Sequence, residues 1–218
     1  MVFALDALFG SLFLLTALGI VATRQVLASL RLFLAQSLLL AASALLVGIA
    51  IGSADLFAVA AISVATKALL IPWLLRRTVA SEVYRTREID QILNIPTSLL
   101  IAAGLVVIAY LVADPLLQVA NLPLIRINLP LGIAAIFLGV FTLAVRREAL
   151  PQLLGLLAVE NGVFFAGVAI APNLPVIAEL AAAIDLPIVA LVIGLLVRRI
   201  HARIGTTAVG RLAVLGES

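Results

Sequence analysis

The sequence contains no cysteine and only one histidine. Without cysteine, the chain cannot form disulfides, thiolate zinc sites, iron–sulfur clusters or a cysteine nucleophile. The single histidine, His201, follows the last apolar run among arginines, so we expect a solvated interface residue and not a haem or metal ligand. We therefore predict that this chain holds no cofactor, metal or active site of its own.

Charge is also scarce, because only 11% of the 218 residues are charged and 65% are hydrophobic. An average soluble domain is roughly 45–50% apolar, so a soluble fold could not hide this much apolar surface. A transmembrane helix needs about 20 apolar residues, and the length accommodates six to eight of them. The composition predicts an all-α integral membrane protein with a single membrane domain over residues 1–218.

Apolar runs predict seven spans, with six as the alternative because two runs are short. The first run lacks a basic region before it and a small-residue cleavage site after it, which favours a retained helix over a signal peptide. The polar, proline-rich stretch 114–128 is expected to lie along the membrane interface. The predicted spans are 3–23, 27–51, 55–75, 95–113, 129–145, 150–171 and 174–197.

The basic residues are distributed asymmetrically over these spans. With the N-terminus outside, one basic residue, Arg126, falls on the outer side, and Arg31 and Lys67 fall within spans. The positive-inside rule then predicts a cytoplasmic C-terminus and explains the basic pI without nucleic acid as a partner. The inner side receives Arg24, Arg76, Arg77, Arg85, Arg87, Arg146, Arg147, Arg198, Arg199, Arg203 and Arg211.

Three ionisable residues lie deep within predicted spans, namely Lys67, Glu160 and Asp185. Each costs about 2.5–3.5 kcal/mol at the bilayer centre, so they should face the bundle interior, water or one another. Desolvation disfavours the charged form of each group, which would let them exchange protons near neutral pH. We predict that these three residues form a proton pathway. A permanent ion pair that only fixes helix packing, or a contact with a partner subunit, remains the alternative.

Two prolines lie close to these charges. Pro72 and Pro187 each remove a helical hydrogen bond and free the carbonyl four residues earlier, which predicts breaks in both helices. Ser63 is one turn from Lys67, and Asn161 directly follows Glu160. We interpret Ser63 and Asn161 as accessory polar groups that water could bridge.

Other polar residues are weaker candidates. Arg31 lies close enough to the cytoplasmic boundary to extend its charge into the interface. The deeper amide of Gln36 must bond another helix or water, and serves either packing or a pathway. Glu179 is interpreted as either an exit group or a solvated carboxylate. The residues expected to mark span ends in water are Asp6, Asp55 and Asp114.

A weak internal repeat relates residues 23–77 to residues 144–199. Each copy contains arginine, a polar residue in mid-helix, a short outer loop, a charged residue in mid-helix and a pair of arginines. The offsets differ by one to four residues, so a duplicated helix hairpin is a hypothesis only.

The segments RREALPQLLGLLAVEN and AAAIDLPIVALVIGLLVRR resemble the last two helices of the small K subunit of respiratory complex I and of the related antiporter C subunit. With LFLAQSLLL, ATKALLIPWLLRR and GLLAVENG included, nearly the whole chain is similar to hydrogenase-4 component E, a membrane subunit of group 4 nickel–iron hydrogenases and formate hydrogenlyase. The resemblance implies a prokaryotic cytoplasmic membrane.

The resemblance carries over to individual residues with one departure. The K subunit has a membrane carboxylate four residues before the helix asparagine, where this chain has Leu157, and its carboxylate is instead Glu160. Three residues are nearly one helical turn, so the face is retained. The second family carboxylate corresponds to Asp185, and Lys67 resembles the lysine of the component E family.

The resemblance implies a non-catalytic subunit of a complex-I-like membrane arm that contributes to proton or Na⁺ translocation. It implies antiporter-like and quinone-chamber-like membrane subunits as partners, and a soluble arm that carries the nickel–iron and iron–sulfur centres. The alternatives are a structural adaptor that moves no ion, or a subunit of a multi-subunit cation/proton antiporter. The electron donor and acceptor are left open.

Overall fold

The computed structural model describes residues 2–78, 89, 91–119, 123–170 and 175–204, and within them every regular element is a helix. Seven helices are long and apolar enough to cross a membrane, which confirms the predicted all-helical bundle and favours seven spans over six. The elements are α1 (Val2–Ala22), α2 (Val26–Ile51), α3 (Ala54–Ser63), the π-helix η1 (Val64–Leu70), α4 (Ile71–Thr78), α6 (Ile95–Val119), α7 (Pro123–Val145), α8 (Ala149–Ile170) and α9 (Pro175–Ile204).

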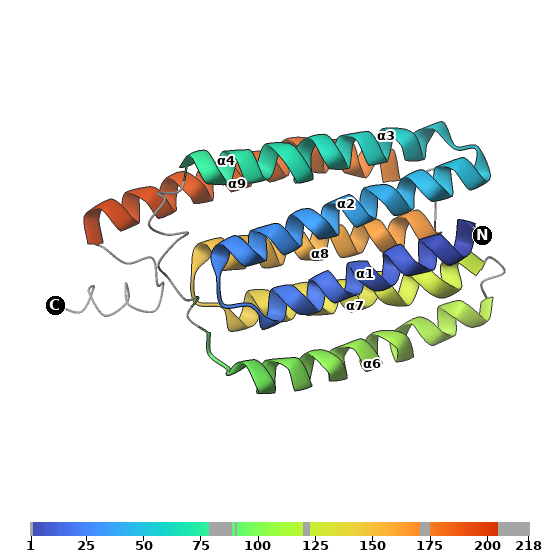
Figure 1. Cartoon of the computed structure of the whole chain (residues 1–218), viewed down its shortest axis with the longest axis horizontal. Coiled ribbons are helices and arrows are strands. Elements are labelled where there is room, and N and C mark those ends of the chain that lie inside the picture. The colour runs from blue at the N-terminus through green and yellow to red at the C-terminus, as the bar shows by residue number, and fades with distance from the viewer. Residues whose placement is uncertain (1, 79–88, 90, 120–122, 171–174, 205–218) are drawn as a thin grey trace.

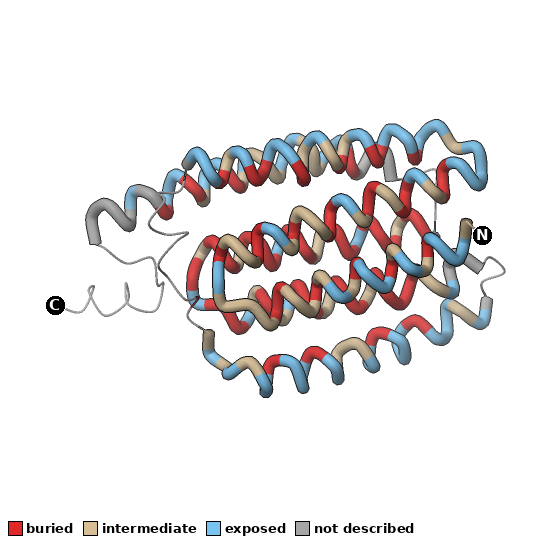
Figure 2. The backbone as a smooth tube through the Cα atoms, viewed as in Figure 1, coloured by how far each residue is buried: buried red, intermediate tan, exposed pale blue. Residues whose placement is uncertain are grey.

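The helices run side by side along the long axis of the molecule (Figure 1). Helix α8 packs against α2, α7 and α9, and it is the most buried helix, with 67% of its span buried. Helix α6 forms one edge, and α9 with the α3, η1 and α4 segment forms the other. The corresponding buried shares of α6 and α9 are only 17% and 22%, and exposed residues follow both edges in Figure 2. The two edges therefore present the largest apolar surfaces to the surroundings.

The stretch 114–128 differs from the prediction. Residues 114–119 continue α6, and residues 123–128 form the first turns of α7. Pro123 is the first residue of its helix, where no helical N–H is needed, and Pro115 lies inside α6, which continues past it to Val119. The described part of this stretch therefore lengthens two helices and does not form a separate interfacial segment.

A glycine ends α2 and turns the chain into α3. Gly52 has a φ of 69° and a ψ of 30°, a left-handed conformation that costs other residues a steric penalty. The backbone N–H groups of Gly52 and Ser53 both donate to Gly48 O. This cap satisfies the end of α2 and allows α3 to return antiparallel to it.

Close contact between α7 and α8 depends on glycine. A Cβ atom at Gly162 would lie 2.8 Å from the backbone nitrogen of Ile136, and one at Gly139 would lie 2.7 Å from that of Val159. Real Cβ atoms do not approach backbone so closely. In membranes, small residues of this kind allow helices to associate through backbone packing. The seam fixes α8, and with it Glu160 and Asn161, in the centre of the bundle.

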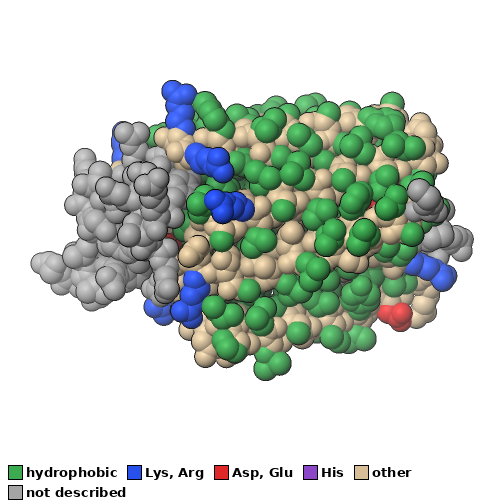
Figure 3. Space-filling view, viewed as in Figure 1, with side chains coloured by type: hydrophobic (Ala, Val, Ile, Leu, Met, Phe, Trp, Pro, Cys, Tyr) green, Lys and Arg blue, Asp and Glu red, His purple; other side chains and the backbone are tan. Residues whose placement is uncertain are grey.

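Basic residues gather at the end of the bundle where α1, α4 and α7 end, which we call the basic end; Figure 3 shows the visible Lys and Arg side chains mostly at this end of an apolar surface. Arg146 is 2% exposed there, and its Nη2 donates to Ile20 O, Val21 O and Thr23 O at 2.8, 3.0 and 2.7 Å. Burial, and secondly the charge of Arg24, lower the pKa of Arg146 to about 10, so it stays charged at neutral pH. This arginine caps α1 and joins it to α7.

Candidate functional site

Lys67 is fully buried and lies between two carboxylates from different helices. Its Nζ is 2.7 Å from Glu160 Oε1 on α8, and it donates to Glu179 Oε2 on α9 at 3.0 Å. The ammonium also lies 4.2 Å from the centre of the Phe164 ring, one turn after Glu160. The three donor positions of the ammonium therefore face two carboxylates and one aromatic face. We call Lys67, Glu160 and Glu179 the Lys67 cluster.

The Lys67 cluster is built on an irregular helix. Lys67 is the central residue of the π-helix η1, where Ile71 N–H donates to Thr66 O, five residues earlier. Pro72 follows and has no N–H, so the ordinary helical bond to Ala68 O cannot form. π-helical turns are rare and are frequently found at functional sites. The helix before Pro72 therefore departs from regular α geometry, as a widened turn around the buried charge.

Glu179 is the residue whose position differs most from expectation. It was interpreted as an exit group or a solvated carboxylate, yet it is fully buried and accepts hydrogen bonds from Lys67 and from the hydroxyl of Ser63. Glu179 is the fifth residue of α9, and its contacts with Lys67 and Ser63 pack this part of α9 against α3 and η1. Residues near the start of a helix are interpreted from sequence as lying near the surface, and only the packing of α9 against α3 and η1 reveals this burial.

Glu160 differs from Glu179 in its surroundings. Its side chain is 16% exposed, whereas those of Lys67 and Glu179 are fully buried. Glu160 Oε2 accepts no hydrogen bond from the described part of the chain. The cluster therefore has one fully buried carboxylate and one whose side chain is partly exposed and whose buried Oε2 has no partner among the described residues.

A chain of amides and hydroxyls continues from Glu160 into α2. The next residue, Asn161, is fully buried and donates through Nδ2 to Gln36 Oε1 at 3.3 Å and to Ser37 Oγ at 3.0 Å. The deep amide of Gln36 is thus bonded to another helix, one of the two possibilities that its position allowed. Gln36 Nε2 and Asn161 Oδ1 have no partner among the described residues. These two atoms keep hydrogen-bonding capacity that no described residue uses.

Asp185 does not join the Lys67 cluster. It lies six residues after Glu179 on α9 and is exposed at the edge of the bundle that α9 forms. Six residues correspond to about 9 Å along the helix and a rotation of more than one and a half turns, which carries the side chain away from α3 and η1. The expectation that the three deep charges would meet is therefore wrong for Asp185. Pro187 lies beside it within α9, which continues through the proline as one helix.

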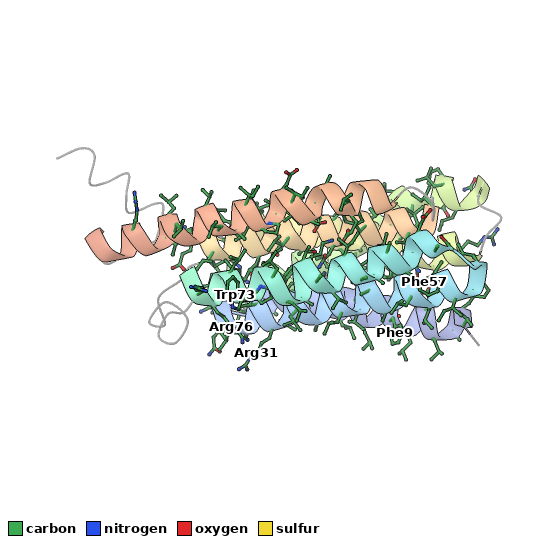
Figure 4. The ribbon with its side chains drawn as sticks, turned by 90° about the horizontal axis from the view of Figure 1, so that it is seen from above. Phe9, Arg31, Phe57, Trp73 and Arg76 are labelled. Atoms are coloured by element: carbon green, nitrogen blue, oxygen red, sulfur yellow. The ribbon has the colours of Figure 1, made fainter. Side chains whose placement is uncertain are left out.

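The remaining candidates lie apart from the cluster. Arg31 is exposed on α2, and Figure 4 shows it pointing away from the bundle at the same end as Trp73 and Arg76. The figure places Phe9 and Phe57 toward the opposite end. This position is the one expected for an arginine that extends to the membrane interface. His201 falls within α9, but its side chain lies outside the described residues.

The sequence-based prediction was also wrong for a second buried carboxylate, that of Asp6. Asp6 was expected to face water at a span end, but it is 1% exposed. It accepts hydrogen bonds from Ser43 Oγ on α2 and from Asn128 Nδ2 on α7, the latter at 2.6 Å. Its partners lie in two other helices and far from it in the sequence, so no local sequence pattern predicts these contacts. Asp55 and Asp114, which were assigned to water in the same way, are both exposed.

Comparison with known proteins gives one informative match. The chain is 34% identical over 209 residues to the uncharacterized protein Rv0085 of Mycobacterium tuberculosis, and the match covers 95% of this chain and 94% of that protein. No family model matches the chain, and no solved structure matches it. Identity at this level along nearly the full length of both proteins shows common descent with a shared fold, so the chain belongs to the family of the mycobacterial protein Rv0085.

Proposed function

We propose that this chain is a non-catalytic subunit of a membrane complex in which the Lys67 cluster relays protons, or exchanges them for Na⁺, as redox chemistry proceeds in partner subunits. The observation that carries the proposal is the burial of one ammonium between two carboxylates, on three helices, at an irregular π-helical turn. A site built only for packing would need no second carboxylate.

The charge of the Lys67 cluster supports a role in proton transfer. One ammonium and two ionised carboxylates would leave a net negative charge buried, and an uncompensated buried charge is strongly unfavourable. Neutrality requires one further proton, shared between Glu160 and Glu179. Because both acids contact the same ammonium, the proton can change acids without changing the net charge of the site. This property is what a relay station requires.

The asymmetry of the two acids supports a direction for the relay. The side chain of Glu160 is 16% exposed and its buried Oε2 has no partner among the described residues, whereas Glu179 is fully buried and hydrogen bonded to Ser63. This difference favours Glu160 as the acid that exchanges a proton with its surroundings. A shift of Lys67 toward one acid would favour protonation of the other. The widened turn of η1 provides a backbone that can accommodate such a shift.

We place this function in the assembly that the sequence resemblance suggests, a complex-I-like or group 4 hydrogenase membrane arm. In this proposal the N-terminus is outside and the basic end faces the cytoplasm of a prokaryotic cell, as the positive-inside rule favours. Antiporter-like and quinone-chamber-like subunits are the proposed membrane partners. A soluble arm with nickel–iron and iron–sulfur centres is the proposed source of redox energy.

One observation favours a second candidate function, that of a structural adaptor. The Lys67 ammonium contacts both carboxylates and the Phe164 ring in the structure, as in a permanent ion-pair network that fixes three helices. An adaptor of this kind would join antiporter-like subunits and move no ion. A place in a multi-subunit cation/proton antiporter would instead retain transport but need no redox arm.

The test uses the intact complex isolated through a tag on this chain and reconstituted into vesicles. Glu160→Gln and Glu179→Gln remove one protonatable group each and keep side-chain size, and Asp114→Asn at an exposed position on α6 is the matched control. The proposal predicts that both glutamine variants assemble, retain redox turnover and lose proton uptake measured with a pH-sensitive dye. Normal proton uptake in both variants would establish the adaptor function, and uptake without any redox partner would establish the antiporter.

A further inference from the structure

The outward face of α9 is an apolar stripe with a carboxylate in its middle. Exposed aliphatic side chains recur at every fourth position, at Leu180, Ile184, Ile188, Val192 and Leu196, and each is more than half exposed. Asp185 is exposed beside them. Figure 4 shows the side chains of α9 projecting away from the rest of the bundle. The stripe therefore faces either lipid or another protein.

Asp185 lies in the interior of the apolar run of α9. The run extends from Glu179, six residues earlier and about 9 Å away, to Val197, twelve residues further and about 18 Å away. An aspartate side chain is too short to reach across such distances, unlike lysine or arginine. Pro187 adds a second polar group, because it leaves the carbonyl of Ala183 without its helical donor.

The other exposed edge of the bundle shows what a lipid-facing helix looks like in this chain. Helix α6 has an even smaller buried share, and its outward residues in the span interior are uncharged, among them Leu100, Val107 and Tyr110. Its one carboxylate, Asp114, lies near the end of the helix and contacts Gln118. Thus the chain keeps charge out of the middle of one exposed edge and places it in the middle of the other.

We propose that the Asp185 face of α9 is an interface for a transmembrane helix of a different protein, which presents Lys, Arg or His at the depth of Asp185. An ionisable side chain inside a membrane is paired or faces a cavity as a rule, and in this structure Asp185 has no such environment within the described chain. A complementary cation supplies it. The inference rests on the membrane position of α9 and stands independently of whether the Lys67 cluster conducts protons.

A second copy of this chain fits the face poorly. A symmetric dimer about an axis along the membrane normal would bring Asp185 toward the same residue of the other copy, and two like charges repel. Within the described spans, the cation at comparable depth is Lys67, which is buried and engaged by two carboxylates. The other cation within a span, Arg31, lies at the basic end of α2. Among the described residues, therefore, no accessible cation lies at the depth of Asp185.

The experiment places the photoreactive residue benzoylphenylalanine at Ile188 in the full-length chain, in the membrane of the organism that produces it. The same residue at Val107 on α6 is the matched control, because it is 60% exposed against 55% for Ile188. Two copies of the chain with different tags are expressed together. Crosslinked peptides are identified by mass spectrometry.

We expect a discrete adduct at Ile188 whose peptide comes from a membrane-spanning segment of another protein and contains Lys, Arg or His, with only lipid adducts at Val107. Asp185→Lys should lower the Ile188 adduct at least about tenfold, because like charges across an interface cost several kcal/mol of binding free energy. Asp185→Leu, which leaves an apolar helix that inserts readily, should also lower it. An adduct joining the two tagged copies, a partner segment without a basic residue, an adduct no stronger than that at Val107, or no effect of either substitution would each overturn the proposal.

Discussion

Replacing Lys67 with methionine removes the positive charge from the Lys67 cluster and keeps most of the side-chain volume. Each of its two ion pairs, at 2.7 and 3.0 Å, represents about 6 kcal/mol of attraction at an effective dielectric constant of about 20. Desolvation of the three groups opposes that attraction, so the measured loss is smaller. Removing one partner of a buried ion pair typically costs about 3–5 kcal/mol, because the remaining charges stay buried without compensation. We expect a loss of that size in the free energy of unfolding.

A second variant separates the effect of charge from that of shape. If the loss arises from the negative charge that Lys67 no longer compensates, then adding Glu160→Gln and Glu179→Gln to Lys67→Met should recover most of it, since neutral replacement of a whole buried ion network is often close to neutral in stability. Reversible unfolding in mixed detergent micelles, followed by circular dichroism and by the fluorescence of the single tryptophan, Trp73, measures both variants. A loss below about 1 kcal/mol for Lys67→Met, the range of exposed ion pairs, would refute the buried pairing. A triple variant no more stable than Lys67→Met would refute the role of charge.

Three further predictions concern the packing that supports the site. Gly162→Ala should destabilise the chain by about 1–3 kcal/mol, because the added Cβ would overlap the backbone of α7. Gly167→Ala on the same helix should be neutral or stabilising, because a Cβ there has no neighbour within 4 Å. Thermal unfolding of the two variants compares them directly. Asp6→Ala leaves its two buried partners without a hydrogen-bond acceptor and should lower the free energy of unfolding by about 1–3 kcal/mol for each unsatisfied group. Asp6→Asn should lower it less, and equal losses in the two variants would contradict this. Arg146→Met removes three hydrogen bonds to the end of α1 and should increase amide hydrogen exchange there by about tenfold or more, with no change in α6.

The helices could be predicted from sequence because the signal is redundant. An apolar run of about 20 residues bounded by charge or proline predicts a spanning helix whatever it packs against, and the predicted spans agree with the structure except where helices extend further. The prediction for the stretch 114–128 was wrong because prolines and polar residues do not exclude a helix that continues from a neighbouring span. Where the chain places a proline in the first turn of a helix, as Pro123 does, the residue begins a helix and does not interrupt one.

The candidate site could be predicted only in part. The sequence shows how far a residue lies from the ends of its helix, but not which face of the helix it occupies in the bundle. Lys67 and Glu160 were identified by distance from their span ends, and the structure brings them within 2.7 Å. Asp185 has the same depth signal but faces outward, whereas Glu179, close to the start of α9, faces inward. The two differ by six residues, which is more than one and a half turns, and the faces of a helix that is apolar all round are not distinguished by hydrophobic pattern. Only the helix neighbours decide which carboxylate is buried.

Helix α2 contributes both to the polar groups beside the Lys67 cluster and to the surroundings of Asp6, but no hydrogen bond between described residues joins the two. Ser37 belongs to the amide chain beside Glu160, and Ser43 bonds Asp6, so the two serines define the ends of a gap of six residues. That gap is about 9 Å along the helix, roughly three times the length of a hydrogen bond. A proton relay at the Lys67 cluster therefore has its direct connections sideways, from partly exposed Glu160 through Lys67 to Glu179, and not along α2 to Asp6. On this geometry, loss of Asp6 should reduce stability while leaving proton uptake per folded complex unchanged, whereas loss of Glu179 should abolish uptake in complexes that remain folded.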